Sequence, residues 1–335
     1  MRDKGITVLG AGSWGTALAI RLANNDNTPC LWGHDADFMD TLSRERQNPQ
    51  YLPGFRFPEN LSIETRLARA VQANRDLLIV VPSHAFREVL MGAAPLLNKK
   101  SRIAWATKGL EHVSGKFMSD VFEDVLGSSH PAAVVSGPTF AREVAADLPT
   151  ALTVASNNPV FANDMASRLH GGTMRAYTSD DMLGVQLGGT VKNVLAIGTG
   201  IADGMQFGAN SRAALITRGL AEIIRLGDAM GARRETLMGR SGVGDLILTC
   251  TDDQSRNRRL GLALGTGTRI AVALKDIGQV VEGYNTAREV VQLAKQYRVE
   301  LPISEQVYRV LHEGLAPAEA VHNLLAREIR SESVS

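Results

Sequence analysis

One lysine of this sequence stands inside an apolar stretch. Lys192 lies in a segment, 182–203, that is apolar almost all round and rich in glycine. Burying an ammonium without a partner is costly, so such a lysine needs a bound anion or a chemical task. The alternative is a lysine whose side chain extends from one end of the helix to water. Asp245 and Thr249 are four residues apart and therefore share one face of a predicted helix. Asp245 is a natural partner for the Lys192 ammonium; the alternative is that its carboxylate only caps its own helix.

Two further polar groups stand where predicted elements begin or end. Ser255, Arg256 and Asn257 open a predicted helix. A guanidinium fork beside helix N-terminal N–H groups suits a phosphate, whereas a solvated polar face is the alternative. Lys108 lies at the end of an apolar run, 102–109, expected to contain a buried strand, and ligands of open α/β sheets bind at such strand ends. We therefore take Lys108 as a site candidate, against the alternative of a solvated loop lysine.

The N-terminal segment 6–19 leads from an apolar run through a G-x-G-x-x-G turn into a helix-forming run. In such a turn Gly10 permits the tight bend, Gly12 lets the backbone approach a pyrophosphate, and Gly15 lets the helix pack on its strand. The free N–H groups and the positive end of the helix dipole attract phosphate charge. Because the motif lies between a strand and a helix, we predict a dinucleotide site rather than a merely structural turn.

The residues that follow the second predicted strand, 28–32, bear on the type of dinucleotide. Gly33 and His34 follow this strand directly, and Asp35 comes only after them. No carboxylate therefore occupies the position at the strand end where it would repel the 2′-phosphate of NADP. His34 could stack on adenine or help to hold that phosphate, or it could be a solvent-facing loop histidine. The sequence thus permits NADP and leaves NAD open.

The order of these runs predicts the fold class. Strand-like runs alternate with helical ones as far as about 178, and only helices are expected from Ser179 onward. We expect an α/β protein with an N-terminal Rossmann-type, doubly wound, mainly parallel sheet followed by an all-α C-terminal domain. The predicted domains are 1–178 and 179–330, with a polar tail at 331–335. Segment 48–54 is expected to be a turn-rich loop, Pro138 a first helical residue, and 280–286 a turn before the next helix.

Composition narrows the class of protein. A chain of 335 residues favours two domains, and 36 Lys and Arg against 35 Asp and Glu argue against a nucleic-acid or anionic-membrane surface. No apolar run approaches the length of a membrane span, and the N-terminus shows no signal peptide. Cys30 and Cys250 match neither a zinc site nor a disulfide framework. We expect a soluble cytoplasmic protein without a metal.

Several blocks, in this order, resemble the bacterial NAD(P)-dependent glycerol-3-phosphate dehydrogenase family over nearly the whole chain. Together they are far more specific than any one of them. The blocks are 10–15, 48–53, 107–111, 136–141, 191–193, 242–246, 255–257 and 281–283.

The resemblance implies roles for individual residues. Lys192 becomes the acid–base residue, Lys108 polarises or anchors the substrate, and Thr249 orients Lys192 or Asp245. Many relatives carry arginine in the turn where this chain has Gly33 and His34, which leaves NADP preference open. The implied cofactor contacts, besides the glycines of the turn, are Ser13, Trp14, His34, Lys108, Ala141, Arg256, Val280 and Glu282. The implied substrate contacts are Lys108, Gly137, Thr139, Lys192, Asp245, Ser255, Arg256 and Asn257.

The resemblance also implies a reaction: reversible reduction of dihydroxyacetone phosphate to sn-glycerol 3-phosphate by NADPH or NADH, in a homodimer, for phospholipid synthesis. A β-hydroxyacid dehydrogenase of related two-domain plan is one alternative. It would carry a K-x-x-x-N pattern, and here Ala196 stands four residues after Lys192. A non-catalytic NADP-sensing protein is the other, and it should lack a buried acid–base lysine.

Overall fold

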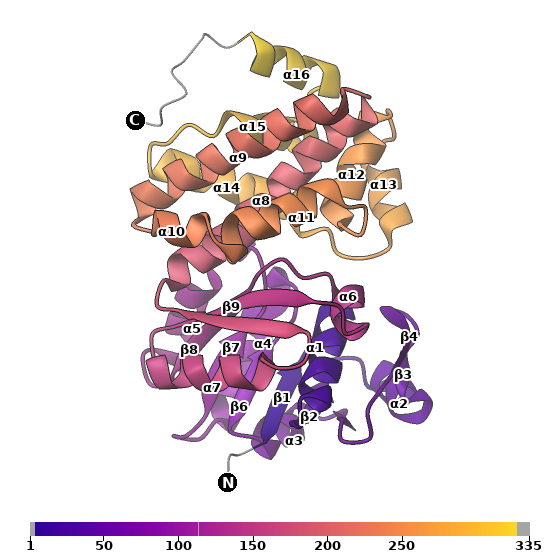
Figure 1. Cartoon of the computed structure of the whole chain (residues 1–335), viewed down its shortest axis with the longest axis vertical. Helices are drawn as coiled ribbons and strands as arrows, with labels where there is room; N and C mark the ends of the chain where they lie inside the picture. Colours follow the sequence, from indigo (N-terminus) through magenta and orange to yellow (C-terminus); the bar gives the residue numbers. More distant parts are fainter. Residues whose placement is uncertain (1–3, 113, 327–335) are drawn as a thin grey trace. The chain divides into compact units, whose positions relative to one another are not determined.

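The computed structural model describes residues 4–112 and 114–326, so the predicted polar tail at 331–335 lies outside the described part. Contacts divide the chain into two units (Figure 1). The sheet unit contains the residues up to Glu111 together with Lys116–Met182. The helical unit contains His112–Gly115 and the residues from Leu183 onward. The short segment His112–Gly115 therefore belongs to the helical unit although residues of the sheet unit flank it on both sides.

Strands and helices alternate along the sheet unit. Its elements are β1 (Gly5–Leu9), α1 (Ser13–Asn24), β2 (Thr28–Trp32), α2 (Ala36–Glu45), β3 (Gln47–Asn48), β4 (Leu52–Arg56), β5 (Ser62–Glu64), α3 (Leu67–Ala73), β6 (Asp76–Ile79), η1 (Ser83–Ala85), α4 (Phe86–Ala93), η2 (Ala94–Leu96), β7 (Arg102–Trp105), α5 (Met118–Leu126), β8 (Ala132–Ser136), α6 (Ala141–Ala145), β9 (Thr150–Ser156), α7 (Pro159–Leu169) and β10 (Met174–Ser179).

Within the described residues, eight of these strands form one sheet in the order β10-β9-β8-β7-β6-β1-β2-β5. Neighbouring strands are parallel except β8 and β9, which are antiparallel. Every residue of β1, β6, β7 and β8 is buried, as expected for strands covered on both faces. One face packs on α1 and α7 through side chains such as Leu18 and Phe161, and the other packs an aromatic group of Phe86, Trp105 and Phe122. The expected mainly parallel, doubly wound sheet is confirmed.

Three local predictions were wrong. The segment 48–54, predicted as a loop, contains the end of β3 and the start of β4, which pair antiparallel. Buried Asn48 and Leu52 hold this ribbon against the rest of the unit. Pro138 does not begin a helix: α6 starts at Ala141, three residues later. The predicted turn at 280–286 ends early, because α14 starts at Glu282.

The helical unit contains only helices among its described residues. They are α8 (Met182–Gly204), α9 (Gly208–Met230), α10 (Arg234–Leu237), the π-helical η3 (Arg240–Gly244), α11 (Asp245–Thr251), α12 (Arg256–Gly265), α13 (Ile270–Ile277), α14 (Glu282–Gln296), α15 (Pro302–His312) and α16 (Pro317–Leu325). No helix of the described chain combines the length and the hydropathy that crossing a membrane requires.

Helix α8 is the centre of this unit, and its glycines admit other backbones. A Cβ at Gly188 would lie 2.5 Å from the carbonyl oxygen of Ser241 in η3. A Cβ at Gly200 would lie 2.3 Å from the carbonyl oxygen of Arg258 in α12. Side chains of α15 contact Gly198 from another direction. These contacts explain why α8 is buried on all sides, as its sequence predicts. They also hold in place the helices that surround Lys192.

A buried carboxylate joins α9 to the start of α15. Glu222, 1% exposed, accepts hydrogen bonds from the backbone N–H groups of Ile303 and Ser304 and from Ser304 Oγ at 2.8 Å. These N–H groups belong to the first turn of α15 and have no partner within their own helix. Burial nevertheless raises the pKa of Glu222 to about 7, against the hydrogen bonds, which lower it.

This pKa predicts a pH-dependent stability. Because the folded protein holds a proton on Glu222 more tightly than the unfolded chain, this contribution is complete below pH 4.5 and is lost as pH rises through about 7. The loss should amount to about 3 kcal/mol at most, and Glu222→Gln, which does not ionise, should remove this pH dependence. Urea unfolding of both proteins from pH 4.5 to 8.5 measures it. Parallel pH profiles would show that Glu222 does not titrate in this range.

Candidate active site

The glycine-rich turn has the shape that a dinucleotide requires. Gly10 has φ +126°, and a Cβ there would lie 2.5 Å from the carbonyl oxygen of Val80, while one at Gly15 would lie 1.8 Å from that of Gly10. These two glycines serve the packing of the turn itself. At Gly12, in contrast, a Cβ would meet no atom of the described residues within 4 Å. The space beside Gly12 is therefore open to a ligand that approaches the backbone closely.

The start of α1 completes this turn. Gly12 is the N-cap residue, no side chain caps the helix, and no acidic residue stands in its first turn. The first N–H groups and the positive end of the helix dipole are left for an anion. Ser13 and Trp14 begin the helix, and within the described residues the buried Trp14 Nε1 has no hydrogen-bond partner. The open space at Gly12 and the uncapped start of α1 fit the phosphates of a bound nicotinamide dinucleotide.

The residues after β2 leave the 2′ position of such a ligand without a carboxylate. His34 is exposed. Asp35 is the N-cap of α2, where its carboxylate accepts the N–H of Phe38 at 3.0 Å. Asp35 is thereby occupied in capping.

Lys108, Gly137 and Thr139 come together within the sheet unit. Lys108 Nζ donates to the carbonyl oxygen of Gly137 at 3.0 Å, and Thr139 Oγ1 donates to the same oxygen at 3.2 Å. Gly137 has φ +153°, and a Cβ there would lie 2.8 Å from Leu152 Cα. The neighbouring Ser136 Oγ is buried without a partner among the described residues. Ser136 was not among the predicted site residues, although its hydroxyl at the end of a buried strand was a usable signal.

Lys192 forms a buried polar group with Asp245 and Thr249 in the helical unit. Lys192 Nζ donates to Asp245 Oδ1 and to Thr249 Oγ1, both at 2.7 Å. Lys192 is 6% exposed and Asp245 1%, so the lysine does not extend to water and the aspartate is more than a helix cap. Thr249 Oγ1 also lies 2.6 Å from the backbone carbonyl of Asp245, one helical turn earlier. The ammonium thus has a fixed direction in a site from which water is largely excluded.

Arg256 begins α12 beside this group in the sequence. Ser255 is the N-cap of α12, and its hydroxyl accepts the N–H of Arg258. Burial lowers the pKa of Arg256, and the charge of Glu282, which opposes this, does not cancel it. Arg256 also lies 3.3 Å, from Nη1 to Oε1, from Gln279, a residue that sequence analysis missed. A desolvated guanidinium at a helix N-terminus is suited to an anionic ligand.

Asn257 joins three helices. Its Nδ2 donates to Asn193 Oδ1 in α8 at 2.9 Å, and its Oδ1 accepts the N–H of Gly283 in α14 at 2.8 Å. Asn193 was also missed as a functional candidate, although its place directly after Lys192 in an apolar helix was a signal. Glu282 is the first residue of α14, and Val280, two residues earlier, is 41% exposed.

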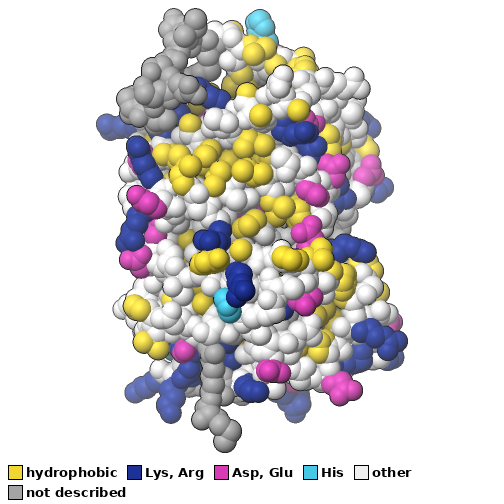
Figure 2. All heavy atoms as spheres, viewed as in Figure 1, with side chains coloured by type: hydrophobic (Ala, Val, Ile, Leu, Met, Phe, Trp, Pro, Cys, Tyr) yellow, Lys and Arg dark blue, Asp and Glu magenta, His cyan; other side chains and the backbone are white. Residues whose placement is uncertain are grey.

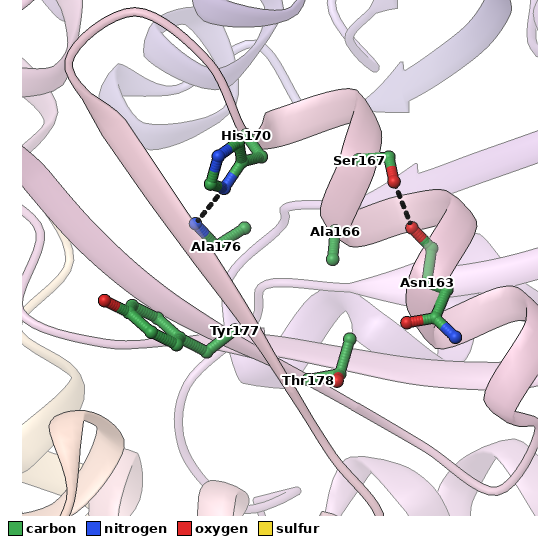
Figure 3. Close-up of a pocket in the computed structure, with 7 residues that line it drawn as sticks. All are labelled: Asn163, Ala166, Ser167, His170, Ala176, Tyr177 and Thr178. Carbon is green, nitrogen blue, oxygen red and sulfur yellow. Dashed lines mark hydrogen bonds between the residues drawn. The ribbon is translucent and has the colours of Figure 1, made fainter.

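The described chain contains no group of three or more His, Cys, Asp or Glu arranged to hold a metal. A cavity of about 410 Å³ lies between α7 and β10 (Figure 3), and none of the predicted site residues lines it. In this cavity His170 Nδ1 accepts the N–H of Ala176 at 3.3 Å (Figure 3), which covers part of the free edge of the last strand.

Family models match both units. The model described as NAD-dependent glycerol-3-phosphate dehydrogenase N-terminus matches residues 5–162, and the corresponding C-terminus model matches 181–322. The chain belongs to this family. Ser13, Lys108 and Thr139 fall within the first match, and Lys192, Asp245 and Arg256 fall within the second.

Individual relatives and solved structures are also similar to this chain. A Shewanella baltica (strain OS185) protein named glycerol-3-phosphate dehydrogenase, NAD(P)+, is 56% identical over 329 residues, which cover 98% of this chain and 97% of the relative. A crystal structure of glycerol-3-phosphate dehydrogenase from Coxiella burnetii is 50% identical, with a TM-score of 0.94, over 97% of this chain and 99% of that one. A ketopantoate reductase from Ralstonia eutropha JMP134 shares the fold alone: it is 15% identical with a TM-score of 0.60, over 95% of this chain and 100% of that one.

Proposed function

We propose that this chain is an NAD(P)-dependent oxidoreductase that interconverts dihydroxyacetone phosphate and sn-glycerol 3-phosphate. The observation that carries the proposal is the buried group of Lys192, Asp245 and Thr249 in a chain of this family. Reduction of the C2 carbonyl creates an alkoxide, which needs a nearby positive charge and a proton. Lys192 supplies both.

The surrounding residues prepare Lys192 for that task. When bound, the reduced nicotinamide supplies the hydride that goes to C2. Asp245 and Thr249 hold Nζ in one direction, so that the proton is delivered to the C2 oxygen. Ser255, Arg256 and Asn257 are proposed to bind the substrate phosphate, so that binding energy far from C2 helps to position the reacting carbon.

The residues around the turn fit the dinucleotide. Gly10, Gly12, Ser13, Trp14 and Gly15 are proposed to hold its pyrophosphate and adjoining groups, because Gly12 leaves an open cradle and Trp14 an orphaned donor. Other contacts stay predictions from the family resemblance: Lys108, Gly137 and Thr139 toward the substrate, and Lys108, Ala141, Arg256, Val280 and Glu282 toward the cofactor.

The finer choice between cofactors is proposed to favour NADP. Asp35, the acidic residue next to His34, is held as the N-cap of α2. Exposed His34 is available to adenine or to a 2′-phosphate.

The biological setting is proposed from the product. sn-Glycerol 3-phosphate is the backbone precursor of glycerophospholipids, so we place the chain in phospholipid synthesis. A cytoplasmic location is proposed because Cys30 and Cys250 are buried thiols in β2 and α11, which suits a reducing compartment.

A homodimer is proposed from one face of α9. Ile216, Leu220 and Ile224 recur every four residues and are only half-buried in the single chain. Figure 2 shows hydrophobic side chains gathered over this part of the helical unit. A second copy would cover this stripe.

The reaction predicts an absorbance change. With dihydroxyacetone phosphate, the protein should oxidise NADPH, and Lys192→Ala should lower kcat by a factor of about 10² to 10⁴ because the proton donor is gone. Loss of absorbance at the nicotinamide band measures it, with Lys295→Ala, an exposed lysine of the same unit, as the control. Since Lys192→Ala removes the ammonium that lies against buried Asp245, a thermal melt and cofactor titration must first show a folded variant. Near-normal turnover in a folded Lys192→Ala protein would falsify the assignment.

Cofactor choice predicts an effect at His34. A carboxylate there should repel the 2′-phosphate and accept a ribose hydroxyl, so His34→Asp should shift the kcat/KM ratio toward NADH by roughly tenfold. Initial rates with both cofactors measure the ratio. His322→Asp makes the same charge change on α16 and should leave the ratio unchanged. An equal ratio in His34→Asp and wild type would place His34 away from the ribose.

The dimer predicts a mass. Sedimentation equilibrium should give twice the 36.0 kDa of one chain, and Leu220→Glu should give the monomer because a buried charge at the interface is costly. Val160→Glu, on an exposed residue of the sheet unit, should remain dimeric. A dimeric Leu220→Glu protein would show that α9 is not the interface.

A further inference from the structure

A buried asparagine outside the predicted site is bonded to the centre of the glycine-rich turn. Asn48, in β3, is 0% exposed. Its Nδ2 donates to the carbonyl oxygen of Ala11 at 2.9 Å and to Thr16 Oγ1 at 2.8 Å. Its Oδ1 accepts the N–H of Tyr51 at 2.9 Å. Both amide hydrogens and the amide oxygen are therefore engaged, and the side chain has one orientation.

The position of Ala11 gives these bonds their meaning. Ala11 lies between Gly10, which makes the bend, and Gly12, whose open side faces no described residue within 4 Å. In a trans peptide the carbonyl oxygen and the following N–H point in opposite directions. Because Asn48 holds the Ala11 carbonyl, the N–H of Gly12 must point away from Asn48. The orientation of this peptide determines whether the N–H can serve an anion.

Thr16 extends the same contact into α1. Its Oγ1 accepts from Asn48 and lies 3.4 Å from the Ala11 carbonyl oxygen. The three groups form a closed triangle of hydrogen bonds between β3, the turn and the first turn of the helix. Rotation of the Ala11–Gly12 peptide would break a buried bond and leave a buried amide hydrogen unsatisfied, which is costly.

We propose that Asn48 is a positioning residue for the cofactor: it fixes the turn in the orientation that binds the pyrophosphate, without touching the cofactor itself. The inference rests on the proposed role of this turn in dinucleotide binding. It assigns a function to the β3–β4 ribbon, which otherwise lies outside the main sheet. The role concerns affinity for the dinucleotide, and the proton donor in the helical unit does not depend on it.

Asn27 offers a matched control on the same helix. It is 6% exposed, and its Nδ2 donates to the carbonyl oxygens of Leu22 and Asn25 at the other end of α1. Asn27→Ala thus removes a buried amide that is bonded to the same helix, but far from the turn along it. Both alanine variants should lower the stability of the fold, whereas only Asn48→Ala should lower the affinity for the cofactor.

The experiment measures NADPH binding by isothermal titration calorimetry in wild type, Asn48→Ala and Asn27→Ala, with a thermal melt of each. Asn48→Ala should raise the Kd for NADPH by about tenfold or more. At saturating NADPH, its kcat and its KM for dihydroxyacetone phosphate should stay within about twofold of wild type. Asn27→Ala should lower Tm by a similar amount and leave the Kd unchanged. Asn48→Leu, which keeps about the same volume but makes no hydrogen bond, should repeat the effect if the alanine variant does not fold.

Three outcomes are decisive. An unchanged Kd in folded Asn48 variants would overturn the proposal, and so would an equal rise of Kd in Asn27→Ala. A wild-type protein that binds neither NADPH nor NADH would instead contradict the proposed function of the turn, so the two failures are distinguishable.

Discussion

Backbone-to-backbone packing against α8 is the constraint on which the helical unit depends. Gly200 and Gly204 face Gly261 and Gly265 of α12, and a Cβ at Gly261 would lie 2.1 Å from the carbonyl oxygen of Ile197. Side chains at this crossing would push the two helices apart. Since α8 carries Lys192 and α12 begins with the predicted phosphate ligands, the crossing sets the spacing between the proposed proton donor and the proposed phosphate site.

A second constraint acts on polar groups that the fold buries. Asp76, 0% exposed, lies in β6 against the guanidinium groups of Arg102 and Arg168. Burial alone would raise the pKa of Asp76, and the bonds and charges of the two arginines outweigh it, so the pKa is lowered. Asn48 and Glu222 are likewise fully engaged. Two buried polar atoms of the described residues, Trp14 Nε1 and Ser136 Oγ, have no hydrogen-bond partner. Trp14 lies in the first turn of α1, after the glycine-rich turn, and Ser136 ends β8 next to Gly137. The hydrogen-bonded groups hold the fold together, and the donor without a partner at the turn lies where we propose that the dinucleotide binds.

Sequence alone predicted those features that depend on local spacing. The buried strands are continuous apolar runs, and the four-residue spacing of Asp245 and Thr249 places both on one helical face, where they meet Lys192. Features that depend on distant partners could not be predicted in this way. The side-chain amide of Asn193 is hydrogen-bonded to Asn257, 64 residues later in the chain. The amide of Asn48 is hydrogen-bonded to Ala11 in the glycine-rich turn, 37 residues earlier. The ribbon β3–β4 contains Pro53 and Gly54, which favour a turn, and tertiary contacts override that preference.

The two constraints meet in the character of Lys192. A buried ion pair contributes little net stability, because desolvation of both charges offsets their attraction. An apolar pair of similar volume would serve packing between α8 and α11 as well or better, so stability does not explain why Lys192 and Asp245 are present. What the pair does provide is an ammonium with one direction, held by Asp245 and Thr249 at equal distances of 2.7 Å inside a rigid, glycine-packed frame. A fixed direction is required of a group that must be in place before charge develops on the substrate. A salt bridge that only stabilises the fold does not require it.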